Sequence, residues 1–234
     1  MKILALDCSA GPASVAVIEN GNILASSFIN VKLTHSQTLL SMVENTLDFA
    51  KISLSDIDAF AINNGPGSFT GIRIGISAVK GLAAPTGKPC IEVSTLLCIA
   101  NLFKNQNCTV CAVMDARCNQ VYNAIFKVEN GKVTRLCEDR AVMINEVITE
   151  LDNITDNIII AGDGAELFRE YTKAKENVII ATEPNKFQNA VGTAMVAEEK
   201  ATLGQTVSAN DLSPFYLRLP QAERELKAKS LKGE

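Results

Sequence analysis

The residues with the clearest capacity for chemistry lie in one glycine-rich segment, 64–75, which reads Asn-Gly-Pro-Gly-Ser-Phe-Thr-Gly-Ile-Arg-Ile-Gly. An apolar run over 57–62 predicts a buried strand before it, and Ser68 can cap a helix after it. A strand that turns through glycines into a helix leaves free backbone N–H groups at the positive end of that helix, where a phosphate or carboxylate can bind. The first candidate chemistry is therefore anion binding at Gly65 and Gly67.

The glycine spacing matches neither of the two common nucleotide-binding loops. A P-loop needs a lysine directly after its last glycine, but Ile72 follows Gly71. A dinucleotide loop needs G-x-G-x-x-G, whereas Gly65, Gly67 and Gly71 are spaced one residue too far apart. Gly71 and Gly75 are four residues apart and suit close packing of another helix or strand, which would offset the about 1 kcal/mol that each glycine costs in a helix. Tight packing and anion binding are both consistent with the segment.

The chain contains an internal duplication. Ile-Glu-Asn-Gly at 18–21 recurs as Val-Glu-Asn-Gly at 128–131, and Asn-Gly between two apolar runs is a strong hairpin signal. Around each hairpin the pattern indicates three strands, a helix, a strand, a glycine turn and a helix. We therefore predict an N-terminal lobe over 1–104, a C-terminal lobe over 105–220 and a polar tail over 221–234.

The individual elements follow from the hydrophobic pattern and the turn residues. The predicted strands cover 2–7, 13–19, 23–31, 57–62, 90–93, 107–115, 121–129, 132–137 and 157–161. The predicted helices cover 36–50, 69–82, 94–103, 144–151, 165–173 and 187–200. The pattern does not indicate on which lobe the last helix packs.

A duplicated βββαβα unit is the layout of α/β proteins of the actin, hexokinase and Hsp70 class (ASKHA), in which two lobes face each other across a cleft. Asp7 and Asp115 end the first strand of each lobe. In such folds these positions help to place phosphate or its metal ion. Each aspartate can instead cap a turn by accepting backbone N–H bonds. The sequence leaves both roles open.

Composition excludes other chemistries. His35 is the single histidine among 234 residues, so neither a two-histidine metal site nor a pair of imidazole acid–base groups can form. A net charge of -4 and the absence of tryptophan provide no basic surface and no large stacking platform for direct binding of nucleic acid. We expect no bound cofactor and no metal.

The cysteines and the lengths of the apolar runs indicate the compartment. Seven cysteines are scattered along the chain, an odd number that fits a reducing environment. Cys108 and Cys111 form a C-x-x-C pattern, but residues three apart in a strand point to opposite faces, so a metal or redox role is disfavoured. No apolar run is long enough to span a membrane. We expect a cytoplasmic protein without membrane association.

The glycine-rich segment resembles the signature of the TsaB (YeaZ) family, partner proteins in making threonylcarbamoyladenosine on tRNA. The glycine segment is the specific part of this likeness, which extends over nearly the whole chain. The supporting similarities are Leu6-Asp7-Cys8-Ser9, His35-Ser36 with Leu39-Leu40, Asp115-Ala116-Arg117 with Val121-Tyr122, and Tyr216-Leu217-Arg218.

The catalytic relatives of that family, TsaD, bind a metal through H-x-x-x-H, and these two positions fall here on Thr95 and Ile99. Neither side chain can replace imidazole. The resemblance therefore implies a non-catalytic scaffold or activator that acts with TsaD and TsaE in threonylcarbamoyl transfer to N6 of adenosine 37 in ANN-decoding tRNAs. It also implies that tRNA is met only through the complex. Without its partner, the apolar face that would meet it could pair with itself, so we expect a homodimer in isolation.

A partner protein of this kind needs a docking surface. The helices over 36–50 and 69–82 are apolar over much of their girth, as expected of helices that lie deep in a core or meet another chain. Close approach of partner helices at Gly71, Gly75 and Ala78 is part of this hypothesis. The residues assigned to the partner face are Leu39, Leu40, Val43, Leu47, Phe69, Gly71, Ile72, Gly75 and Val79.

Two other functions remain open. The chain could be a small-molecule kinase or ATPase that holds ATP and magnesium with Asp7, Asp115 and the two glycine turns, one at Gly65 and Gly67 and the other at Gly162-Asp163-Gly164. It could also be a general interaction domain without a role in RNA modification.

Overall fold

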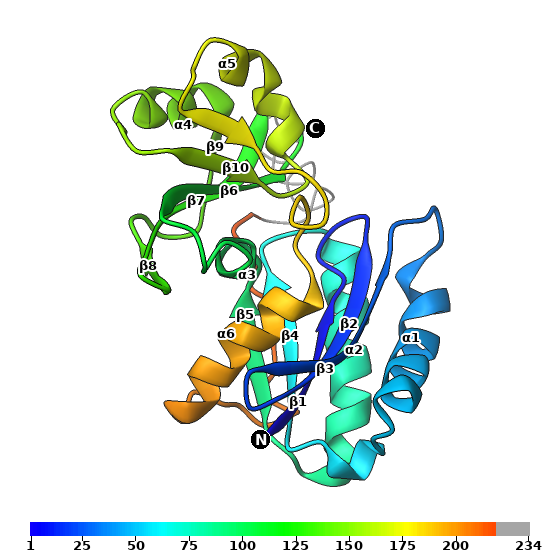
Figure 1. Cartoon of the computed structure of the whole chain (residues 1–234). Coiled ribbons are helices and arrows are strands. Elements are labelled where there is room, and N and C mark those ends of the chain that lie inside the picture. The colour runs from blue at the N-terminus through cyan, green and yellow to red at the C-terminus, as the bar shows by residue number, and fades with distance from the viewer. Residues whose placement is uncertain (219–234) are drawn as a thin grey trace, which may run out of the picture.

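The computed structural model describes residues 1–218, so the predicted tail over 221–234 lies outside the described residues. Two β-sheets, one from each repeat, form two lobes that are stacked one above the other in Figure 1. Both predicted hairpins are confirmed. Asn20 and Gly21 have φ values of 47° and 78°, and Asn130 and Gly131 have 52° and 75°. These are the left-handed conformations of a type I′ turn, which Asn-Gly adopts readily.

The first lobe has five strands in the order β3-β2-β1-β4-β5. The first three strands are antiparallel, and the pairs β1–β4 and β4–β5 are parallel. Its elements are β1 (Lys2–Asp7), β2 (Ala13–Glu19), β3 (Asn22–Ile29), α1 (His35–Ala50), β4 (Ala59–Gly65), α2 (Phe69–Ala83) and β5 (Cys90–Ser94).

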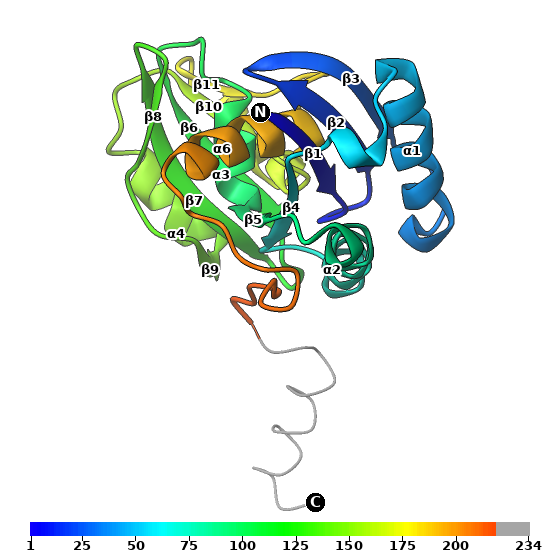
Figure 2. The same cartoon turned by 90° about the horizontal axis from the view of Figure 1, so that it is seen from below.

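The second lobe repeats this order. Its sheet runs β11-β10-β6-β7-β8, and β9 pairs with β7 beside it. The strands and helices that follow β5 are α3 (Thr95–Asn101), β6 (Cys108–Asp115), β7 (Gln120–Glu129), β8 (Lys132–Arg135), β9 (Arg140–Met143), α4 (Ile144–Leu151), β10 (Ile158–Ala161), α5 (Arg169–Lys173), β11 (Val178–Ile180) and α6 (Ala190–Thr202). Of these, α3 and α6 lie between the two sheets (Figure 2), and the others form the second lobe. The strands β9 and β11 were not predicted.

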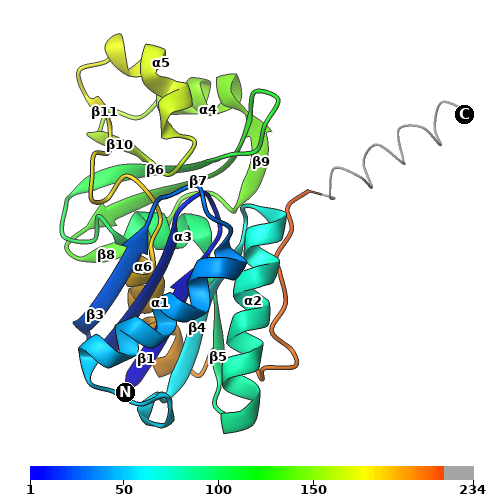
Figure 3. The same ribbon diagram turned by 90° about the vertical axis from the view of Figure 1, so that its right-hand side faces the viewer.

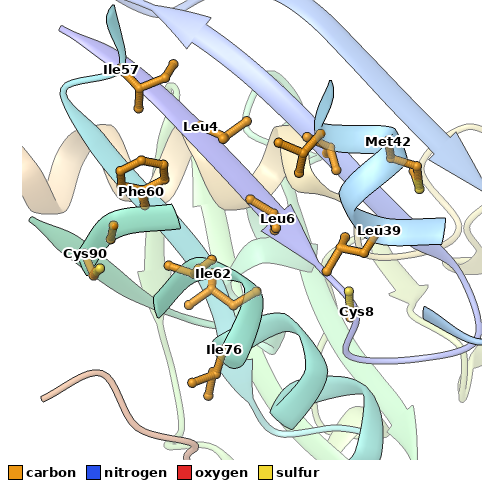
Figure 4. Packing of buried hydrophobic residues seen from close by; sticks show 14 of the residues in the cluster. Leu4, Leu6, Cys8, Leu39, Met42, Ile57, Phe60, Ile62, Ile76 and Cys90 are labelled. Atoms are coloured by element: carbon orange, nitrogen blue, oxygen red, sulfur yellow. The ribbon is translucent and has the colours of Figure 1, made fainter. Parts of the chain in front are cut away.

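One face of the first sheet is covered by α1 and α2, which lie side by side (Figure 3). The residues between the helices and the sheet are almost all aliphatic, and they form the largest cluster of buried side chains. Figure 4 shows part of this cluster, with Leu39 and Met42 of α1 and Ile76 of α2 around Leu4, Leu6 and Ile62 of the strands. The burial of one full face fixes both helices on the sheet.

The two helices between the sheets connect the lobes. The last helix, α6, packs on the opposite face of the first sheet through Ala190, Ala194 and Ala197. In turn, α3 packs on the second sheet through Leu96 and Ile99. Figure 2 shows α3 and α6 in the middle of the molecule, with one sheet on either side.

This packing corrects the predicted lobe boundary. A C-terminal lobe over 105–220 assigns α6 to the wrong lobe, because its apolar face covers β1 and β2. The following segment also returns to the first lobe, since Val207 pairs with Cys90 of β5 and Leu212 joins the first core. Among the described residues, no helix is long and apolar enough to cross a membrane.

Candidate functional site

The glycine turn after β4 is packed against the chain itself. Gly67 has a φ of 156°, and a Cβ there would lie 2.3 Å from the carbonyl oxygen of Ser9. Ser68 donates its backbone N–H to the same oxygen at 2.7 Å. Gly65 has a φ of 139°, and its Cβ would lie 2.1 Å from the carbonyl oxygen of Phe215. Close approach of two other backbone segments therefore explains these glycines.

The two helical glycines of α2 also face the chain's own core. A Cβ on Gly71 would lie 2.0 Å from the carbonyl oxygen of Cys8, and one on Gly75 would lie 2.9 Å from Cδ1 of Ile62. The tight-packing interpretation is confirmed, with Cys8, directly after β1, and Ile62 of β4 as the neighbours. The prediction that Gly71 and Gly75 admit a partner helix is wrong, because the space beside them is filled from within.

A cleft of about 420 Å³ lies where the two lobes meet. Ser9, Gly67 and Phe69 line it from the first lobe, and Asp115, Arg117 and Asp163 line it from the second. The turns that follow β1 and β6 thus face each other, as the duplicated fold predicts. Asp115 lies in this cleft, but the side chain of Asp7 does not line it.

Asp7 is completely buried. Its Oδ1 accepts hydrogen bonds from the Ser9 hydroxyl at 2.6 Å, the Ser9 N–H at 3.1 Å and the Asn63 side-chain amide at 2.9 Å. Asn63 in turn accepts a bond from Thr193 of α6 at 3.0 Å. Burial raises the pKa of Asp7 above its ordinary value, although the hydrogen bonds act in the opposite direction. The aspartate is therefore part of a buried network that joins β1, β4 and α6.

Asp115 repeats this turn in the second lobe. Its Oδ1 accepts the backbone N–H of Arg117 at 2.7 Å, two residues on, as Asp7 accepts that of Ser9. Its Oδ2 also pairs with the Arg117 guanidinium at 3.1 Å. Of the two roles that the sequence left open for the aspartates, turn capping is the one present in both lobes.

Asp163 is a cleft residue that the sequence analysis did not select. It sits in the Gly-Asp-Gly turn after β10, and its Oδ1 accepts the backbone N–H of Asp115 at 3.2 Å. Burial raises the pKa of Asp163 to about 6, against the effect of that hydrogen bond. The available signal was its position, because this turn corresponds to the glycine turn of the first lobe.

The two positions that the resemblance aligns with metal ligands lie inside the protein. Thr95 and Ile99 are both fully buried on α3, and Ile99 belongs to the core of the second lobe. Over residues 1–218, no group of three or more histidine, cysteine or acidic side chains is arranged to hold a metal ion. Neither Thr95 nor Ile99 has a donor that faces the cleft.

Most residues assigned to the partner face belong to the core. Leu40 is 58% exposed, and Phe69 is partly exposed at the edge of the cleft. The other seven are buried under the chain's own helices and strands, so their assignment to a partner contact is wrong. These seven are Leu39, Val43, Leu47, Gly71, Ile72, Gly75 and Val79.

The outward side of the helix pair carries different residues. On α2, Thr70, Arg73, Ser77 and Gly81 are exposed, and Ile74 and Ala78 are half-buried. A groove of about 540 Å³ runs between this side of α2 and the loop before α1, and its walls include Val31, Leu33 and Ile74. The hydrophobic periodicity identifies the apolar side of α2, which is buried in the core here. The opposite side is the one exposed to solvent.

Comparison with known proteins supports the same fold and family. A family model described as TsaD, tRNA N6-adenosine threonylcarbamoyltransferase, matches residues 22–225. The Escherichia coli K12 protein named tRNA threonylcarbamoyladenosine biosynthesis protein TsaB is 32% identical, over 98% of this chain and 100% of that protein. The structure of YeaZ from Pseudomonas aeruginosa matches with a TM-score of 0.80 and 29% identity, covering 92% of this chain and 99% of that one.

A more distant structure shows the fold alone. Component A of (R)-2-hydroxyglutaryl-CoA dehydratase from Acidaminococcus fermentans has a TM-score of 0.52 at 16% identity, over 86% of this chain and 99% of that one. The two repeated lobes and the cleft between them define an ASKHA-type α/β protein. Within that class, the match to the family model and the identity over the full length show that the chain belongs to the TsaB (YeaZ) branch of the TsaD family.

Proposed function

We propose that this chain is a non-catalytic subunit in the biosynthesis of threonylcarbamoyladenosine on tRNA, the process for which its TsaB relatives are named. It acts in the cytoplasm with a TsaD-type transferase and with TsaE, and it supports transfer of the threonylcarbamoyl group to N6 of adenosine 37 in ANN-decoding tRNAs. It meets tRNA only within that complex.

The observation that carries this proposal is the burial of Thr95 and Ile99. The resemblance aligns these positions with metal ligands of the catalytic relatives, but here both side chains are buried, and Ile99 helps to hold α3 against the second sheet. The sealed position of Asp7 supports the same conclusion, since the side chain is fully buried and its Oδ1 accepts hydrogen bonds from Ser9 and Asn63. A chain without these ligands contributes to the reaction through contact with another subunit.

The proposed docking surface is the outward side of α1 and α2. Leu40 of α1 is exposed, and Val31 and Leu33 are 53% and 56% exposed beside the groove that α2 borders. On α2, Ser77 and Gly81 carry little or no side chain, so a partner helix can approach the backbone closely. The same surface supports self-association when the partner is absent, which makes a homodimer the expected state in isolation.

Reconstitution from purified components tests this function. The chain alone is expected to leave an ANN-decoding tRNA transcript unmodified, and the TsaD-type partner with TsaE is expected to modify it efficiently only after the chain is added. Modification by the chain alone would overturn the non-catalytic assignment. Full activity of the other components without the chain would overturn the subunit role.

A further inference from the structure

Residues 213–218 form a strap across the glycine turn. The backbone N–H of Phe215 donates to the carbonyl oxygen of Asn64 at 2.8 Å, and the Asn64 side-chain amide donates to the carbonyl oxygen of Ser213 at 3.1 Å. Gly65 lets the strap pass, because a Cβ there would collide with the carbonyl oxygen of Phe215. The first part of the strap is thus fixed to the end of β4.

The middle of the strap is held by α2. The rings of Tyr216 and Phe69 pack with their centroids 4.7 Å apart. The Tyr216 hydroxyl accepts a 2.7 Å hydrogen bond from Nε of Arg73, whose guanidinium also lies 5.6 Å from the centre of the same ring. Arg73 belongs to the outward side of α2. One side chain therefore connects the strap with the proposed docking surface.

The far end of the strap reaches the second lobe. Nη1 of Arg218 donates to the carbonyl oxygen of Ala116 at 2.8 Å. Directly after Ala116, the residues Arg117, Cys118 and Asn119 have φ values of 66°, 55° and 57°. Three consecutive residues other than glycine in the left-handed region are unfavourable, so such a loop persists only where its neighbours hold it.

Phe69 on one side of the interlobe cleft and Ala116 on the other both contact the strap. We propose that residues 213–218 act as a latch that sets the opening of this cleft and holds the loop 116–119 in place. We also propose that Arg73 couples the latch to docking on α2. The latch is independent of the proposed function, whereas the coupling rests on it.

The coupling follows from competition for one donor. A carbonyl or carboxylate group of a partner that docks on α2 and accepts from Nε of Arg73 displaces the Tyr216 hydroxyl from that N–H. Loss of the bond to Tyr216 loosens the strap and, through Arg218, the loop 116–119. By thermodynamic linkage, a variant with a weakened latch binds the partner more tightly.

Hydrogen exchange of the full chain, followed by mass spectrometry, tests the latch. In Arg218→Ala we expect exchange over 116–119 to become about tenfold faster, because a charge-assisted hydrogen bond is lost. Arg218→Lys retains a cationic donor and should restore part of the protection. Arg169→Ala removes an ion pair with Glu166 outside the cleft and should leave 116–119 unchanged.

Tyr216→Phe removes only the hydroxyl group that accepts from Arg73, and it provides a second test of the latch if Arg218→Ala fails to fold. It should also accelerate exchange over 116–119, by about threefold. Unchanged exchange in the folded Arg218 and Tyr216 variants would overturn the latch.

Addition of a purified TsaD-type partner to the unsubstituted chain tests the coupling. We expect faster exchange over 116–119 in the complex and tighter binding by Tyr216→Phe. If the partner co-elutes but exchange over 116–119 does not change, the coupling is wrong and docking stands. If the partner does not co-elute, the proposed function and the coupling both fail, and exchange in the isolated chain still decides the latch.

Discussion

Nε2 of His35 lies 2.8 Å from the carbonyl oxygen of Ala10, and because a carbonyl only accepts, this ring nitrogen donates the hydrogen bond. The bond joins the first residue of α1 to the turn after β1. The imidazole also lies beside α2, where its Cδ2 would be 3.2 Å from a Cβ on Gly71. The single histidine thus connects the start of α1 and the adjacent α2 with the turn after β1.

This junction leaves no room for a side chain at Gly71. We expect Gly71→Ala to lower the free energy of unfolding by about 3 kcal/mol, because the new Cβ would lie 2.0 Å from the Cys8 carbonyl oxygen and the backbone must shift. Gly81→Ala is the matched control in the same helix, since a Cβ there meets nothing within 4 Å. It should stabilise the protein by about 0.5 to 1 kcal/mol. Urea denaturation measures both, and equal stability of the two variants would contradict this packing.

The docking surface predicts a loss of binding without a loss of stability. Leu40→Asp places a charge on the exposed side of α1 and should weaken co-elution with a TsaD-type partner at least about tenfold, while the melting temperature changes little. Leu203→Asp is the control, because Leu203 is 71% exposed and directly follows α6, which packs on the opposite face of the first sheet from α1 and α2. If both variants bind as the unsubstituted chain does, the surface lies elsewhere.

Asp163 predicts a dependence of stability on pH. Its pKa in the folded protein is about 6, above the ordinary value of 3.8, so the folded state retains a proton that the unfolded chain releases between about pH 4 and pH 6. Stability therefore falls as the pH rises through this range. Asp163→Asn removes this titration, and its stability relative to the unsubstituted chain should improve by about 1 to 3 kcal/mol between pH 4 and pH 7.

Asp152→Asn is the control, because the pKa of Asp152 is shifted in the opposite direction to that of Asp163. Its hydrogen bond with Lys175 lowers the pKa of Asp152, so the carboxylate stabilises the folded state at neutral pH and this contribution disappears in acid. The Asp152→Asn variant should therefore lose stability relative to the unsubstituted chain as the pH rises. Urea titrations at several pH values would reveal both trends, and parallel pH curves for Asp163→Asn and the unsubstituted chain would refute the shift at Asp163.

Calorimetry with Mg-ATP separates the subunit from a kinase or ATPase. We expect a Kd weaker than about 1 mM for the isolated protein, because the Asp7 carboxylate is buried and the Ser68 N–H is already bonded to Ser9. Titration of Mg²⁺ alone provides the baseline. Micromolar binding that Asp115→Asn abolishes would favour the enzyme instead.

Much of the fold was predictable because its signals are local. The Asn-Gly hairpins depend on two residues that adopt positive φ, and α4 was predicted with its observed ends, Ile144–Leu151. The helix α2 begins after Ser68, whose hydroxyl accepts the N–H of Gly71. Such features are written in a few neighbouring residues.

The features that the sequence did not reveal depend on contacts between distant segments. The side of α2 that carries Gly75 was interpreted as a surface for a partner, but the neighbour is Ile62 of the same chain. A hydrophobic period shows which side of a helix is covered, and it does not show by what. For the same reason the pairing of Arg218 with Ala116, 102 residues apart, could not be foreseen.

The packing of α6 on the first sheet has a consequence for folding during synthesis. The five strands of that sheet are synthesised first, but one face of the sheet remains uncovered until α6 (Ala190–Thr202) has been made. A protein fragment that ends near residue 104 would expose this apolar face to solvent, together with Leu96 and Ile99 of α3. Although the two lobes repeat the same order of elements, we do not expect either half to fold stably on its own.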